Sequence, residues 1–127
     1  MSEVVADASA VLAFALGENG ERKVAKVREQ CLVATPNLLE AVSKLLRADF
    51  PADRVQVFLQ QFFPRVVQLD RELAEASGVL HATTRGHGLS YADCVCLMLG
   101  MQLKATVLTA DRRWEKVGLD VKLELIR

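Results

Sequence analysis

The sequence predicts an α/β fold, a three-layer α/β/α sandwich with a mainly parallel central sheet, in one domain that spans residues 1–127. Short β-branched runs alternate with longer helical patterns along the chain, and this order is typical of parallel sheets. No linker, repeat or low-complexity tract interrupts the alternation. The composition is 51% hydrophobic over 127 residues, which supplies enough apolar side chains for one core.

The predicted strands are short apolar runs, and the last one alternates apolar and polar residues as an edge strand does. They are residues 3–6, 31–34, 66–69, 106–109 and 121–126.

The segments between the strands have helical periodicity and recognisable start and stop residues. Gly17 and Gly20 separate the first two helices, and Pro36 and Pro51 are favourable first-turn residues for two later ones. The predicted helices are residues 9–16, residues 21–29, one opened by Pro36, one opened by Pro51, one capped by Asp70 that ends near Gly86 or Gly88, one capped by Ser90 that runs to about Leu103, and a short one from Asp111 to Gly118.

The helix opened by Pro36 has the clearest apolar pattern. Its side chains at i, i+1, i+4, i+7 and i+8 predict one stripe that faces the core. They are Leu38, Leu39, Val42, Leu45 and Leu46.

Charge and cysteine content exclude little but favour one compartment. The 16 basic and 16 acidic residues balance, so no overall positive field indicates a nucleic acid, although acids gathered in one pocket would leave a basic remaining surface. The three cysteines have no disulfide-like spacing, which favours reduced thiols and a cytoplasmic protein. No signal peptide and no run of transmembrane length is evident, so we expect no membrane association.

Asp93 is the clearest candidate for a functional acid. It is the only charged residue from 89 to 103, and it shares a helix face with Cys96 and Gly100. A carboxylate in such apolar surroundings is costly unless it is paired, hydrogen-bonded or bound to a metal. A capping box with Ser90 explains it equally well, and both interpretations stay open here.

Two further aspartates follow predicted strands. Asp7 comes after the first strand and Asp111 after the fourth, and each precedes a helix. Each alone is most simply a helix N-cap. Open α/β sheets bind ligands at the carboxyl ends of their strands, so the coincidence of the two favours a site. Glu40 is a weaker candidate, because an exposed ion pair with Lys44 four residues later would explain it fully.

Four short segments together resemble the PIN-domain nucleases and, more narrowly, the VapC-type toxins of bacterial toxin–antitoxin pairs. They occur in the family's order, with similar spacing, and the resemblance covers nearly the whole chain. The segments are VADASA at 5–10, TPNLLE at 35–40, LSYADC at 89–94 and LTADRRW at 108–114.

The resemblance implies a Mg²⁺- or Mn²⁺-dependent endoribonuclease that hydrolyses RNA through a metal site of four carboxylates. These catalytic, metal-binding residues would be Asp7, Glu40, Asp93 and Asp111. The hydroxyls of Ser9 and Thr109 would orient the ligands or a water molecule. Oxygen ligands suit both ions, and packed carboxylates repel one another until a cation binds. Two ions could then activate a water and stabilise the leaving oxygen.

Basic residues near the acids are candidates for binding RNA phosphates. They are Arg85, Arg112 and Arg113, and ordinary solvated loops explain them equally well. Many family members have another acidic or amide residue just after the Asp111 position, where this chain has Arg112. Arg113 follows it, so the resemblance supplies no matching residue for a fifth acidic contact, and Glu115 is only a distant substitute.

The resemblance also implies partners, namely a VapB-like antitoxin and a second copy of the chain in a homodimer. Aromatic side chains near Phe14 and Phe62 would offer a groove for an amphipathic segment. An RNA-processing or quality-control PIN nuclease without a toxin role is the alternative. A response-regulator receiver fits poorly, because the chain lacks adjacent acids after the first strand, and a catalytically silent binding module is disfavoured by the four acids.

Overall fold

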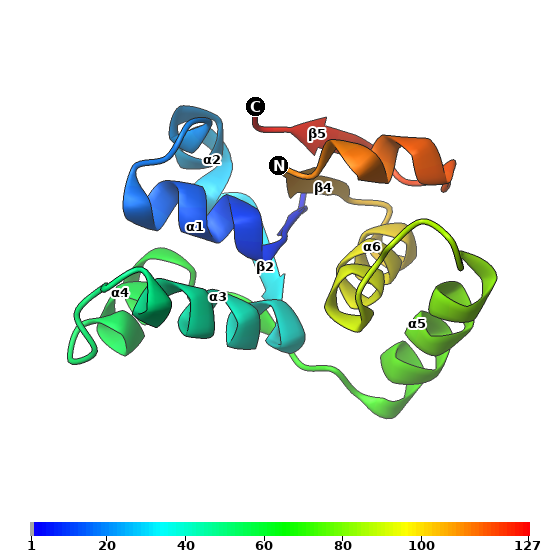
Figure 1. The fold of residues 1–127 in the computed structure, drawn as a ribbon, viewed down its shortest axis with the longest axis horizontal. Coiled ribbons are helices and arrows are strands. Elements are labelled where there is room, and N and C mark those ends of the chain that lie inside the picture. The colour runs from blue at the N-terminus through cyan, green and yellow to red at the C-terminus, as the bar shows by residue number, and fades with distance from the viewer. Residues whose placement is uncertain (1) are drawn as a thin grey trace.

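The computed structural model describes residues 2–127, in which a five-stranded parallel sheet lies between two helical layers (Figure 1). The strand order β3-β2-β1-β4-β5 places the first strand at the centre. The predicted fold class is confirmed. The strands are β1 (Val4–Ala6), β2 (Cys31–Ala34), β3 (Val66–Val67), β4 (Thr106–Thr109) and β5 (Leu123–Leu125).

The helices alternate with the strands along the chain, as the sequence predicts. They are α1 (Ala8–Leu16), α2 (Glu21–Val27), α3 (Thr35–Arg47), α4 (Val55–Phe62), α5 (Arg71–Thr83) and α6 (Tyr91–Leu103), with short 3₁₀ helices η1 (Arg28–Gln30) and η2 (Arg112–Val117). No helix within residues 2–127 is long and apolar enough to cross a bilayer.

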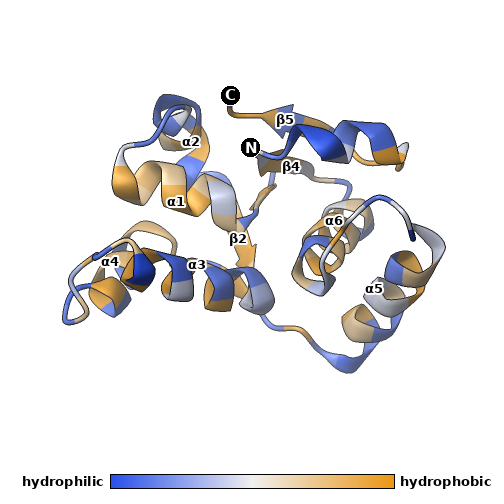
Figure 2. Ribbon diagram, in the orientation of Figure 1, coloured by the Kyte–Doolittle hydropathy of each residue, from blue (hydrophilic) through white to orange (hydrophobic). Residues whose placement is uncertain are grey.

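Alternate residues of β1 divide the core into two parts, because successive side chains of a strand point to opposite faces of the sheet. Val4 and Ala6 pack into the core that α1, α2, α3 and α4 cover. Val5 packs into the second core, which α5 and α6 cover together with Trp114. Figure 2 shows apolar and polar residues within the same helices, as expected for helices that have one face on a core. The central strand is therefore buried on both faces.

The helix predicted to start at Pro51 begins four residues later, at Val55. The N–H of Arg54 donates to the carbonyl of Pro51 at 3.0 Å, which closes a single turn before the helix. Pro51 therefore fixes the backbone of this turn instead of opening α4, since its restricted φ suits either position.

The predicted core stripe of α3 is partly wrong. Leu45 is buried, but Leu39 is 71% exposed and Leu46 is 41% exposed. The buried line of the helix has a spacing of four and consists of Asn37, Ala41 and Leu45. Adjacent residues of a helix point about 100° apart, so the second leucine of each Leu-Leu pair turns away from the sheet.

Several element ends also differ from the prediction. The third and fifth strands are shorter than expected, and the helix after Asp70 ends at Thr83, before either glycine. The last helix, after Asp111, is a 3₁₀ helix. Differences of a few residues are common at the ends of helices and strands, where the regular hydrogen-bond pattern breaks down.

Gly100 allows α6 to approach β4 closely, so Gly100→Ala should destabilise the fold. A Cβ at this position would overlap Cγ2 of Val107 and lie 3.3 Å from Cγ2 of Val121. We expect a loss of about 1–3 kcal/mol in the free energy of unfolding, measured by urea denaturation.

Gly78→Ala is the matched control, because this glycine is also within a helix but a Cβ added to it would have no neighbouring atom within 4 Å. It should stabilise the protein by about 0.5–1 kcal/mol. Equal effects of the two substitutions would contradict the close packing of α6 on β4.

Candidate active site

The parallel pairing of β1 with β4 brings together residues that are far apart in the sequence. Ala6 lies opposite Leu108 in the register, so Asp7, which follows β1, lies beside the end of β4. The N–H of Asp7 donates to the carbonyl of Leu108 at 3.2 Å. Both strands end at the same edge of the sheet, where Asp7 and Asp111 each precede a helix.

Asp7 is buried, with 6% of its surface exposed, and its carboxylate accepts three hydrogen bonds. Ser9 Oγ donates to Oδ1 at 2.6 Å, and the N–H of Ala10 donates to the same oxygen at 3.0 Å. Thr109 Oγ1 donates to Oδ2 at 2.6 Å. The N-cap interpretation of Asp7 is therefore confirmed, and Thr109 holds the second oxygen.

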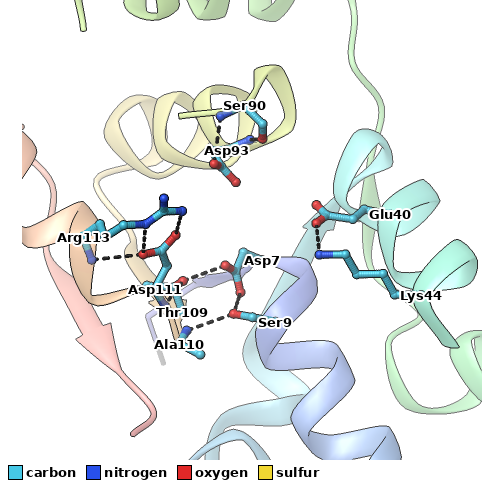
Figure 3. A network of polar contacts seen from close by, with 10 residues as sticks. All are labelled: Asp7, Ser9, Glu40, Lys44, Ser90, Asp93, Thr109, Ala110, Asp111 and Arg113. Atoms are coloured by element: carbon cyan, nitrogen blue, oxygen red, sulfur yellow. Dashed lines mark hydrogen bonds and ion pairs between the residues drawn. The ribbon is translucent and has the colours of Figure 1, made fainter. Parts of the chain in front are cut away.

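The two hydroxyls also hold the segment that carries Asp111. Ser9 Oγ accepts from the N–H of Ala110 at 2.9 Å, and Thr109 Oγ1 accepts from the N–H of Asp111 at 3.0 Å. Figure 3 shows this network between the end of β4 and the start of α1. Each hydroxyl thus donates to Asp7 and accepts from the loop after β4, which fixes the positions of both aspartates.

Asp93 lies in the first turn of α6 and forms the capping box that the sequence suggests. Its Oδ2 accepts from the N–H of Ser90 at 2.9 Å, and Ser90 Oγ accepts from the N–H of Asp93 at 3.0 Å. The box uses one carboxylate oxygen, so it leaves the other free for a second role. In Figure 3 the carboxylate points toward the space between Asp7 and Glu40.

Glu40 forms the expected ion pair with Lys44, with an Oε2–Nζ distance of 2.7 Å. It lies in the second turn of α3. Asn37 positions this helix, since its Nδ2 donates to the carbonyl of Ala92 in α6 at 3.3 Å. The sequence analysis did not predict this positioning role of Asn37. The one sequence feature that could have indicated it is its spacing of four residues from Ala41, which places Asn37 in the buried line of α3.

Asp111 is paired with Arg113. The guanidinium donates from Nε to Oδ1 at 3.0 Å and from a terminal nitrogen to Oδ2 at 2.8 Å. Arg85 and Arg112 are exposed and do not line the pocket. Their proposed contact with RNA stays a prediction.

The four sequence-predicted acids line one pocket of about 280 Å³ among the described residues, at the carboxyl edge of the sheet. Its other lining residues include two cations, Lys44 and Arg113. The sequence predicts Lys44 only as the ion-pair partner of Glu40. Because Lys44 lies four residues after Glu40 on the same helix, that spacing could also have indicated that Lys44 lines the site that contains Glu40.

The surroundings of the pocket shift the pKa values of Asp7, Asp93 and Asp111, and burial is the largest cause for the first two. Burial raises the pKa of Asp7 against the opposing hydrogen bonds, and the charge of Asp93 raises it further. Burial also raises the pKa of Asp93, with contributions from Glu40 and Asp111. The hydrogen bonds from Arg113 instead hold the pKa of Asp111 below its ordinary value.

Comparison with known protein families gives one decisive match. The family model of the PIN domain matches residues 4–119. The chain belongs to the PIN-domain family. No curated protein sequence matches it significantly.

Solved structures confirm the fold of this PIN domain. It is similar to a chain of the DNA-bound VapBC complex from Salmonella typhimurium, with 15% identity, a TM-score of 0.77 and coverage of 100% of both chains. A toxin–antitoxin complex from Klebsiella pneumoniae gives 12% identity, a TM-score of 0.77 and 98% coverage of both chains. VapC20 of Mycobacterium tuberculosis, a toxin that cleaves the sarcin–ricin loop, gives 14% identity, a TM-score of 0.75 and coverage of 94% of this chain and 99% of the other.

The donor set of the pocket fits a hydrated divalent cation. Within residues 2–127, no three His, Cys, Asp or Glu side chains are close enough to share one ion directly. Mg²⁺ commonly keeps several of its waters and binds through one or two carboxylates, so a dispersed set of acids suits it. Four carboxylates against two cationic side chains in this pocket also leave a negative charge that a divalent ion would balance.

Asp93→Asn should raise the stability of the protein at neutral pH. The raised pKa of Asp93 means that the folded state holds the proton more tightly than the unfolded chain. Wild-type stability contributed by this group is therefore present below the ordinary value of 3.8 and is lost as the pH rises through the folded pKa. The asparagine can still accept from Ser90, so the cap remains. Urea unfolding from about pH 3.5 to about pH 7 measures the free energy of unfolding of both proteins. Relative to wild type, the free energy of unfolding of the variant should increase as the pH rises.

Asp111→Asn provides the opposite case, because the pKa of Asp111 is lowered by Arg113. Its stabilising contribution is present above pH 3.8 and is lost as the pH falls through the folded pKa, so this variant should be less stable than wild type at neutral pH.

A uniform loss of stability in Asp93→Asn at every pH would mean that Asp93 serves the helix cap alone.

Proposed function

We propose that this PIN domain is a Mg²⁺- or Mn²⁺-dependent endoribonuclease and the toxin of a type II toxin–antitoxin pair. The observation that carries the proposal is the pocket lined by Asp7, Glu40, Asp93 and Asp111 in a chain of this family. Carboxylates placed together at the carboxyl edge of a parallel sheet are costly unless a cation neutralises them. This cost is explained if the acids are ligands.

The four acids have different tasks in this proposal. Asp7 is fixed through both oxygens by Ser9 and Thr109, which also hold the segment that carries Asp111. Asp93 contributes the carboxylate oxygen that its helix cap does not use. When bound, the metal would supply an activated water and charge stabilisation at the leaving oxygen. The residues themselves supply position and negative charge, and no protein nucleophile is required.

Lys44 and Arg113 are the cations best placed to bind the RNA phosphates. Both line the pocket, and each has a flexible or exposed side chain that is paired with an acid of the site. Arginine binds phosphate oxygens in the same forked geometry with which it binds a carboxylate. Arg113 can therefore release the carboxylate of Asp111 and bind a phosphate through the same guanidinium N–H donors. Arg85 and Arg112 would extend the basic surface beyond the pocket.

The toxin role is supported by the similarity of the chain to members of toxin–antitoxin complexes over nearly their whole length. A VapB-like antitoxin would dock with an amphipathic segment on the aromatic cluster of α1 and α4, where the rings of Phe14 and Phe62 are 5.5 Å apart and partly exposed. A basic side chain of the antitoxin could then enter the acidic pocket. We propose a homodimer in the cytoplasm as the active form.

The purified protein should cleave single-stranded RNA only when Mg²⁺ or Mn²⁺ is present. Asp93→Asn should lower the cleavage rate by at least about 100-fold, the cost of removing one electrostatic group from a catalytic site. Gel analysis of a labelled RNA measures this rate. Asp53→Asn is the matched control, because this exposed aspartate lies outside the pocket, and it should cleave as wild type does.

The same ions should raise the thermal stability of wild type. At tenfold the dissociation constant, binding contributes about 1.4 kcal/mol, which is roughly 5 °C in Tm for a domain of this size. The shift should be smaller in Asp93→Asn. No shift at millimolar metal, together with no cleavage, would remove the nuclease proposal.

Expression of the chain alone in its host should arrest growth, and co-expression of the reading frame immediately upstream should restore it. The Asp93→Asn variant should be harmless. If wild type is harmless while the purified protein still cuts RNA with metal, the toxin role is wrong. The alternative of an RNA-processing or quality-control nuclease would then take its place.

A further inference from the structure

Trp114 lies in η2 and is the only tryptophan of the chain. Its side chain is 2% exposed and belongs to the core that α5 and α6 cover. Trp114 is also one of the residues that line the acidic pocket. The indole therefore lies at the border between the core and the candidate site, where its one polar atom can take part in either.

The indole Nε1 of Trp114 is a buried donor without a partner. Among the described residues, no acceptor lies in hydrogen-bonding geometry to it. The other such atoms within residues 2–127 belong to Glu3, Asn37 and Ser77, and none of these residues lines the acidic pocket. A buried N–H without an acceptor is costly, and natural proteins keep few of them. The unused donor of Trp114 therefore indicates a partner that reaches it in another state of the site.

The carboxylate of Asp111 is the acceptor that the geometry favours. Asp111 and Trp114 both line the pocket, and the backbone N–H of Trp114 donates to the carbonyl of Asp111 at 3.2 Å. Arg113 is the main cause of the low pKa of Asp111, and the indole N–H of Trp114 adds a smaller contribution. The indole and the carboxylate are therefore close, although they do not yet have the geometry of a hydrogen bond.

Arg113 fills most of the acceptor capacity of Asp111. Oδ1 accepts from the backbone N–H and from Nε of Arg113, and Oδ2 accepts from a terminal guanidinium nitrogen. A carboxylate has about four lone-pair sites, so about one remains. A carboxylate that binds a metal and is also held by Trp114 needs two. Asp111 can therefore do both only after the side chain of Arg113 has withdrawn.

The two donors differ in their freedom to move. The side chain of Arg113 is 66% exposed, and an exposed ion pair is weak enough to exchange its partner. Trp114 is held in a close-packed core, where a ring cannot move without losing its contacts. Arg113 is thus the temporary partner of Asp111, and Trp114 is the permanent neighbour.

We propose that Trp114 is a positioning residue, whose indole N–H holds the carboxylate of Asp111 toward the metal once Arg113 has released it. The proposal rests on the metal-dependent nuclease activity proposed above and adds the residue that keeps Asp111 in place when Arg113 turns to the RNA phosphate. Donors behind a ligand carboxylate fix its orientation and strengthen metal binding. The donor that is unpaired beside the Arg113–Asp111 pair gains its acceptor in the loaded site.

The first test replaces one atom of the full-length protein. Because the chain has one tryptophan, a tryptophan auxotroph can substitute it with benzothienylalanine, which keeps the two-ring shape and carries sulfur in place of the N–H. Mn²⁺ affinity, measured from the electron paramagnetic resonance of the free ion, should fall by about 10- to 100-fold, which is typical for loss of a partner of a metal ligand. Stability to urea without metal should be unchanged or higher, because an unpaired buried donor has been removed.

Trp114→Phe is the genetically encoded counterpart. It should weaken Mn²⁺ binding as the benzothienylalanine protein does, although its smaller ring also lowers stability. Ser77→Ala is the matched control, because it removes an unpartnered buried polar atom outside the pocket, and its Mn²⁺ affinity should equal that of wild type. In an Asp111→Asn background, replacing Trp114 should have little further effect, because Trp114 acts through this carboxylate.

Nitrogen-15 NMR gives a readout that is independent of affinity and cleavage. The spectrum contains one indole N–H signal, because the chain has one tryptophan. Mg²⁺ should move its proton resonance downfield as the hydrogen bond forms. Arg113→Ala should move it in the same direction without metal, because the guanidinium no longer holds the carboxylate of Asp111.

Unchanged Mn²⁺ affinity in the benzothienylalanine protein would overturn the positioning role, and so would an equal loss of affinity in the Asp111→Asn background. Lower stability with unchanged affinity would indicate a structural role alone and would also overturn it. If wild type binds neither ion at millimolar concentration, the metal-dependent nuclease proposal fails and the role of Trp114 fails with it. Metal binding and RNA cleavage that are insensitive to the indole N–H would overturn only the role of Trp114.

Discussion

The buried carboxylate of Asp7 is the constraint on which the rest of the site depends. It cannot be solvated by bulk water, so its oxygens must be hydrogen-bonded within the protein. Ser9, Ala10 and Thr109 provide these bonds, and two of the donors also hold the loop that carries Asp111. The hydrogen bonds to this buried carboxylate thus link the central strand to β4 and hold Asp7 and Asp111 at the same edge of the sheet.

The other acids are held by interactions that also serve local structure. Asp93 caps α6 and Glu40 is paired along α3, so each has a simple structural explanation. These explanations do not compete with a functional one, because a cap or an ion pair fixes the side chain whose position a metal site requires. The raised pKa values of Asp7 and Asp93 are the electrostatic cost of this arrangement.

The protein separates two kinds of surface. The carboxyl edge of the sheet carries charged and polar groups, including Lys44 and Arg113. The layer of α3 and α4 exposes apolar side chains, and the aromatic cluster with Phe14 lies beside it. Chemistry on an ionic ligand and docking of an amphipathic protein segment need opposite surfaces, so this division allows both on one small domain.

The sequence by itself determined the alternation of strands and helices, the acids that follow β1 and β4, and the cap formed by Ser90 and Asp93. These features depend on residues only a few positions apart, which periodicity and capping rules describe. Tertiary structure alone decided that Thr109 bonds to Asp7 across 102 residues, that Lys44 and Arg113 line the pocket, and that Leu39 turns outward. The order of strands in the sheet and the packing of α3 against the sheet determine these contacts. Local sequence patterns contain no information about which distant strand becomes a neighbour.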